Sequence, residues 1–142
     1  MDLIYLLCLI ALGYFSGTRV ERKHYQSIKR REAAFLQLPV VTGENFLSEN
    51  GTVDRVQFVC GNAALSTDYF KLIFAGLRNL LGGRLSAYET LVDRARREAI
   101  LRLKETARGA DIILNLRVET SRITDAGSVE VFAYATAVHY KK

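Results

Sequence analysis

The sequence is poor in proline, cysteine and histidine, and each shortage excludes a class of protein. One proline in 142 residues argues against a disordered chain and favours regular helices and strands. Two cysteines far apart in the sequence, Cys8 and Cys60, give no disulfide framework and suit a reducing compartment. The two histidines, His24 and His139, are also far apart, so the sequence has no short-spaced Cys/His metal motif.

Positive charge is confined to one short segment. Between residues 19 and 31 six cations stand against a single acid, Glu21, while acids and bases balance over the rest of the chain. A balanced folded region does not indicate binding to nucleic acid, so the cluster needs a local explanation. Its members are Arg19, Arg22, Lys23, Lys29, Arg30 and Arg31.

A long uncharged run, Leu3–Phe15, lies directly before this cluster. Met1, Ser16 and Gly17 can extend the run. A helix of about 17 residues would be about 25 Å long, which is close to the lower limit for crossing a hydrocarbon core of about 30 Å. We therefore expect residues 1–17 to form a transmembrane anchor. The side chains expected to contact lipid are Leu3, Ile4, Leu6, Leu7, Leu9, Ile10, Leu12 and Phe15.

Two other interpretations of this run fit less well. A signal peptide has its basic residues before the apolar run, whereas here they follow it, and a core helix would have polar positions on one face. Cations after a span stay in the cytoplasm, so we expect a single-pass protein of a bacterial inner membrane, with its N-terminus outside and its C-terminal domain cytoplasmic. The cluster would bind lipid head groups or, alternatively, form a solvated helix face, with His24 at the surface.

The remaining chain divides into a connector and a domain. Residues 18–38 are rich in helix formers and predict a basic helical connector that stops before Pro39, and residues 39–142 form the domain. Strands are expected over 39–47 and 55–65, and helices over 68–81 and from a capping box at Ser86 and Glu89 to Gly109. Small apolar residues recur along the second of these helices, which predicts close packing on a sheet: Val92, Ala95, Ala99, Leu103 and Ala107.

A hairpin closes the domain. Alternating apolar residues begin at Ile112 and at Phe132, and a turn is expected at 125–127. The order β-β-α-α-β-β predicts an α+β fold, a mainly antiparallel sheet with two helices on one face. The last strand also has an aromatic face, which no remaining element of a monomer would cover, so we expect a subunit interface there.

With these elements placed, the sequence resembles the YbjQ-like family, whose domain is labelled heavy-metal-binding. The resemblance spans Val40 to Tyr140 and would make this chain a membrane-anchored member. It implies a subunit that closes into a homo-oligomeric ring, pentameric by expectation, and no established enzymatic activity. The matching motifs are Val40–Gly43, Phe74–Arg78, Gly82–Glu89, Ala95–Ala99, Gly109–Asp111 and Ala133–Val138.

Two groups of residues are candidate ligand sites. Cys60 and His139 fall on strands and are a candidate metal pair across the sheet or across a ring; otherwise they are a core and a surface residue. Gly82, Gly83 and Arg84 precede a helix and form a candidate anion site, or a helix stop whose arginine pairs elsewhere.

The sequence thus predicts a non-enzymatic, homo-oligomeric binding or scaffolding module. Neither histidine has a recognisable nucleophile and carboxylate around it, which excludes triad-type catalysis. The expected partners are other copies of the chain, membrane lipid and an unnamed membrane protein, with no nucleic acid. The alternative is a protein that binds a metal or a small anion between subunits; a heavy metal is implied by the family label alone.

Overall fold

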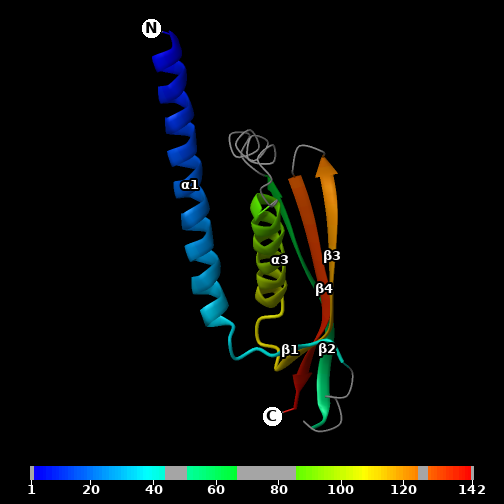
Figure 1. The fold of residues 1–142 in the computed structure, drawn as a ribbon. Helices are drawn as coiled ribbons and strands as arrows, with labels where there is room; N and C mark the ends of the chain where they lie inside the picture. The colour runs from blue at the N-terminus through cyan, green and yellow to red at the C-terminus, as the bar shows by residue number, and fades with distance from the viewer. Residues whose placement is uncertain (1, 44–50, 67–85, 125–127, 142) are drawn as a thin grey trace.

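The computed structural model describes residues 2–43, 51–66, 86–124 and 128–141, which form three layers (Figure 1). Helix α3 covers one face of the sheet, and the C-terminal half of helix α1 runs along the other side of α3. The elements in chain order are α1 (Asp2–Ala34), β1 (Val40–Val41), β2 (Val53–Ser66), α3 (Ser86–Thr106), β3 (Ile112–Thr124) and β4 (Ser128–Tyr140).

The four described strands form one mixed sheet in the order β1-β3-β4-β2. Strand β4 is antiparallel to both β2 and β3, whereas the short β1 is parallel to β3. The fold is therefore mixed α+β. The helix expected over 68–81 and the hairpin turn at 125–127 lie outside the described residues, and so do residues 44–47 of the strand expected over 39–47. Of its described part, Val40–Val41 form a strand.

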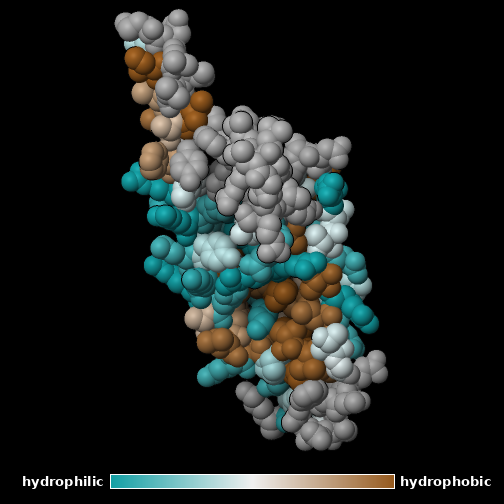
Figure 2. All heavy atoms as spheres, in the orientation of Figure 1, coloured by the Kyte–Doolittle hydropathy of each residue, from teal (hydrophilic) through white to brown (hydrophobic). Residues whose placement is uncertain are grey.

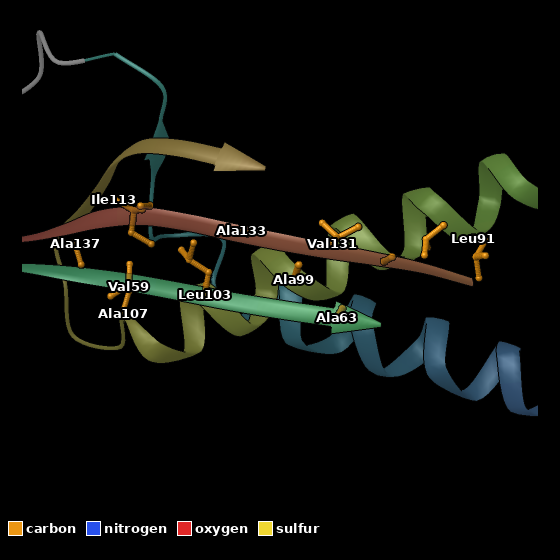
Figure 3. Close-up of a cluster of buried hydrophobic side chains, with 13 residues drawn as sticks. Val59, Ala63, Leu91, Ala99, Leu103, Ala107, Ile113, Val131, Ala133 and Ala137 are labelled. Carbon is orange, nitrogen blue, oxygen red and sulfur yellow. The ribbon is translucent and has the colours of Figure 1, made fainter. Parts of the chain in front are cut away.

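The core lies between α3 and the inner face of the sheet (Figure 3). The small side chains of Ala95 and Ala99 bring the helix close to β2 and β4, where Ala133, Ala135 and Ala137 are equally small and buried. A Cβ at Gly61 would overlap the backbone of α3, so helix and strand are in direct contact there. The predicted close packing of small residues is confirmed.

The large apolar residues of β2 lie on the face of the sheet away from α3. Val56 and Phe58 belong to the outer face and are 57% and 66% exposed, whereas Val59 and Ala63 are buried beneath α3. The reason is the short distance between helix and sheet around Gly61, which leaves no room for a large side chain at that point of β2.

A bulge in β3 also changes which residues share a face. Asn115 has a positive φ of 57°, and the pairing of β3 with β4 shifts between Leu114 and Arg117. Because one extra residue reverses the alternation, Ile112 and Leu114 pack on the outer face while Leu116 and Val118 contact the inner core. Strict alternation over 112–118 had placed all four on one face.

Helix α1 contradicts the expected membrane anchor. The anchor and the connector are joined into one helix of 33 residues, and its uncharged part ends at Gly17 and Thr18 before the cations begin. Within the described residues, no helix has both the length and the apolar content that crossing a membrane requires. The predictions of a transmembrane helix over residues 1–17 and of a single-pass inner-membrane protein are therefore wrong, because the apolar part of α1 is too short for a hydrocarbon core of about 30 Å.

Candidate functional site

The outer face of the sheet carries a group of exposed apolar side chains on β2 and β4. Val56, Phe58, Phe132 and Tyr134, here called the aromatic face, lie on the side of the sheet away from α3. Phe58 is 66% exposed and Phe132 40%. The ring of Tyr134 lies between them, with its centroid 6.3 Å from Phe58 and 5.7 Å from Phe132. Large apolar groups gathered on one face are typical of a contact surface.

Both signs of charge border the aromatic face. Arg117 and Glu119 of β3 lie opposite Tyr134 and Phe132 in the β3–β4 register, and Glu130 follows on β4. Directly paired residues project from the same face of a sheet, so these charges belong to the outer face as well. The face therefore matches a partner that is itself apolar and of mixed charge.

The structure does not bring Cys60 and His139 together in one chain. Cys60 pairs with Tyr134, whereas His139 pairs with Arg55, so the two lie five residues apart along the strands, about 16 Å. They also project from opposite faces, because an odd number of residues separates their positions. A metal ion bound by both would need a second copy of the chain.

His139 lines an open depression of about 500 Å³ at the end of the sheet, together with Asp54, Asp111 and Lys141. Its Nε2 atom is 3.1 Å from Nη2 of Arg55, and since arginine only donates, this nitrogen is the acceptor of that hydrogen bond. Asp111 accepts a hydrogen bond from the backbone N–H of Tyr140. In the described parts of the chain, no three Cys, His, Asp or Glu side chains converge as metal ligands.

The other sequence-based candidates are placed as follows. Gly82, Gly83 and Arg84 lie outside the described residues, so the candidate anion site has no structural description. His24 is not a free surface residue, because its Nε2 atom lies 3.6 Å from the Glu98 carboxylate. Of the cation cluster, Arg31 is bound within the protein, and the other five members are exposed on α1.

Glu98 is the centre of a polar network between α1 and α3 that the sequence analysis missed. Its side chain is 4% exposed and accepts hydrogen bonds from Arg31 and, at 2.9 Å, from Arg102. Arg102 also donates to the carbonyl oxygen of Asn62, which links the network to β2. Burial by itself would raise the pKa of the Glu98 carboxyl, but the two guanidinium groups bring the pKa below its usual range.

Further ion pairs extend this contact along α1. Arg97 binds Glu32 through two hydrogen bonds, which lowers the pKa of that carboxyl, and Arg94 lies 3.2 Å from Glu21. Among the α1 side chains that the structure describes, Ile28 is the one that is fully buried. Glu21 and Glu32 are three helical turns apart and therefore lie on the same face of α1. This spacing is the feature of the sequence that could have indicated a contact between α1 and the rest of the protein.

Because the pKa values of Glu32 and Glu98 are lowered in the folded protein, we expect acid to weaken the contact between α1 and α3. Glu98 and Glu32 have pKa values below their ordinary range in the folded protein, so their contribution is complete above about pH 4.5 and is lost as the pH falls through the folded values. We expect hydrogen exchange at α1 amides, corrected for intrinsic rates, to quicken between pH 5 and pH 3 before β4 does. A Glu32→Gln variant should respond less. Equal protection of α1 at both pH values would contradict this prediction.

A family model described as "Putative heavy-metal-binding" matches residues 39–141, most of the chain and all of its described strands. The chain belongs to this YbjQ family. The resemblance seen in the motifs is thereby confirmed, although the described residues do not supply a metal-ligand set to match the description.

Members of the YbjQ family from archaea and bacteria are similar in sequence. The UPF0145 protein of Natronomonas pharaonis is 41% identical over 92 residues, which cover 63% of this chain and 88% of the relative. The UPF0145 protein of Hahella chejuensis is 36% identical over 103 residues, covering 71% and 92%. A crystal structure of a DUF74-family protein with unknown function from Pediococcus pentosaceus matches with a TM-score of 0.46 at 16% identity, covering 73% of this chain and 98% of that one.

Proposed function

We propose that this YbjQ domain is a non-enzymatic scaffolding module whose copies join through the outer face and the open edges of the sheet. The observation that carries the proposal is the aromatic face, where Phe58 and Val56 are more than half exposed beside Tyr134. Leaving such a group in water forfeits about 25 cal/mol for every Å² that a contact would bury. A second copy that covers this face recovers that free energy.

The charges favour a second copy over a strongly charged partner. Arg117, Glu119 and Glu130 border the aromatic face, so the surface carries both signs of charge and can match a neighbouring copy, which carries both as well. Nucleic acid, which selects a basic surface, fits poorly. Both histidines are engaged with charged side chains, His24 with Glu98 and His139 with Arg55, which supports a role without catalysis.

The edges of the sheet favour a ring. In the described residues, strand β3 pairs with β1 only at Ile113 and Leu114. On the outer edge of β2, side chains of α3 donate hydrogen bonds to the carbonyl oxygens of Cys60 and Asn62. The remaining lengths of β3 and β2 are two different edges that strands of neighbouring copies can extend. Joining unlike edges is a head-to-tail contact, which closes into a ring when the rotation allows it. The expected five-fold ring is part of this proposal.

The proposal is tested by the mass of the assembly. We expect native mass spectrometry and light scattering to find wild-type chain as a closed oligomer and Phe58→Asp as a smaller species, because a buried unpaired carboxylate weakens association at least about 100-fold. Gln57→Asp, next along β2 but on the other face, is the matched control and should keep the wild-type mass. A monomeric wild type, or a Phe58→Asp variant of unchanged mass, would overturn the proposal.

A further inference from the structure

Besides the aromatic face of the sheet, the protein has a second exposed apolar surface, which lies on helix α1 and takes no part in the proposed sheet contact. Its inward face, with Glu21, His24 and Ile28, is turned to α3. On its outward face Ile4, Tyr5, Leu9 and Leu12, here called the α1 stripe, are between 65% and 71% exposed. Figure 2 shows hydrophobic residues, coloured brown, at the end of α1 that projects beyond the rest of the protein.

We infer that the α1 stripe is a contact between two copies of this chain, which lie antiparallel along their N-terminal halves. The spacing of Tyr5, Leu9 and Leu12 is the four-and-three spacing of a helix–helix seam. The stripe bears no charge, so an apolar surface such as itself is its matching partner. This contact is independent of the sheet contact proposed above.

The order of charges along α1 decides the direction. Asp2 precedes the apolar run, while Arg19 and Arg22 follow it on exposed positions. Two parallel helices would place cation against cation at the end of the overlap. An antiparallel overlap centred between Leu9 and Leu12 instead sets position 2 of each copy opposite position 19 of the other, and it sends the remaining cations to opposite ends of the dimer.

The experiment separates this contact from the sheet contact. In the Phe58→Asp background, where the sheet contact is removed, we expect a dimer by native mass spectrometry, and adding Leu12→Glu should raise its dissociation constant at least 100-fold. If Phe58→Asp alone leaves the mass of the assembly unchanged, the scaffold proposal fails. The α1 contact is then tested in the wild-type chain, where we expect Leu12→Glu to halve the mass of the assembly. An unchanged mass after Leu12→Glu in both backgrounds overturns the α1 contact.

Charge reversal tests the direction. We expect Asp2→Arg to weaken the dimer about tenfold and the double variant Asp2→Arg/Arg19→Asp to restore it within about threefold. Lys29→Asp, exposed on α1 outside the overlap, is the matched control and leaves the dimer unchanged. A double variant that is weaker than Asp2→Arg contradicts the antiparallel order. Binding of monomeric chain to phosphatidylglycerol vesicles, lost with Leu12→Glu, would assign the stripe to lipid and overturn the inference.

Discussion

Replacing Gly61 by alanine should destabilise the protein by about 3 kcal/mol, the largest effect expected for adding one methyl group to the described core. The added Cβ would overlap the carbonyl oxygen of Ala99 and the amide nitrogen of Leu103. Both atoms belong to the backbone of α3, so rotating a side chain does not relieve the overlap. Either α3 moves away from β2 or the strand bends, and both changes open the core around Ala95 and Ala133.

Thermal unfolding measures this effect. For a chain of this size a loss of about 3 kcal/mol lowers the melting temperature by about 10 °C. Gly43→Ala is the matched control, because a Cβ at Gly43 meets nothing within 4 Å, and its melting temperature should stay within about 1 °C of wild type. A Gly61→Ala protein with the same melting temperature as the wild type would contradict the close contact between α3 and β2 at Gly61.

Replacing Glu98 by glutamine should cost about 2 kcal/mol. Breaking a buried ion pair typically costs 3–5 kcal/mol, but the Arg31 and Arg102 side chains are 30% and 50% exposed, and water screens part of the loss. The amide keeps the shape of the side chain and removes the charge that two guanidinium groups share. We expect urea unfolding to give the lower stability and hydrogen exchange to place the change in α1 and α3.

Glu105→Gln is the matched control for this prediction. Glu105 also binds Arg31 but is 34% exposed, so its loss should cost at most about 0.5 kcal/mol. In the double variant Glu98→Gln/Arg31→Met, part of the lost stability should return, because the more buried of the two guanidinium groups is gone and Arg102 keeps its hydrogen bond to the carbonyl oxygen of Asn62. Equal losses for Glu98→Gln and Glu105→Gln would mean that burial of Glu98 does not matter.

Local patterns in the sequence predicted the elements better than their surroundings. The capping box at Ser86 and Glu89 placed the start of α3 correctly, and the repeated alanines predicted its close contact with the sheet. Alternation in β2 and β4 identified strands, but it did not tell which face lies inward, because both faces are apolar. Only the distance between α3 and Gly61 decides that the small residues are inside.

The errors came from contacts between segments far apart in the chain. Composition alone does not show whether a short apolar run crosses a membrane or forms one end of a longer helix. Here the run is the N-terminal part of a 33-residue helix. The role of Arg31 depends on Glu98, which lies in another helix. Asn115 has a positive φ at the bulge, and asparagine tolerates that conformation better than most residues, but most asparagines do not adopt it, so the residue type alone does not predict the bulge.

The continuity of α1 has a mechanical consequence. One unbroken helix joins the projecting N-terminal end to the turn before Pro39, where the half-buried amino group of Lys104 donates to the carbonyl oxygens of Phe35 and Leu38. Ion pairs also hold α1 against α3 from Glu21 to Glu32, so the projecting part of the helix, about 28 Å long, acts as a lever. A push on its far tip is therefore delivered as torque to the helix that carries Lys104, and through it to the sheet.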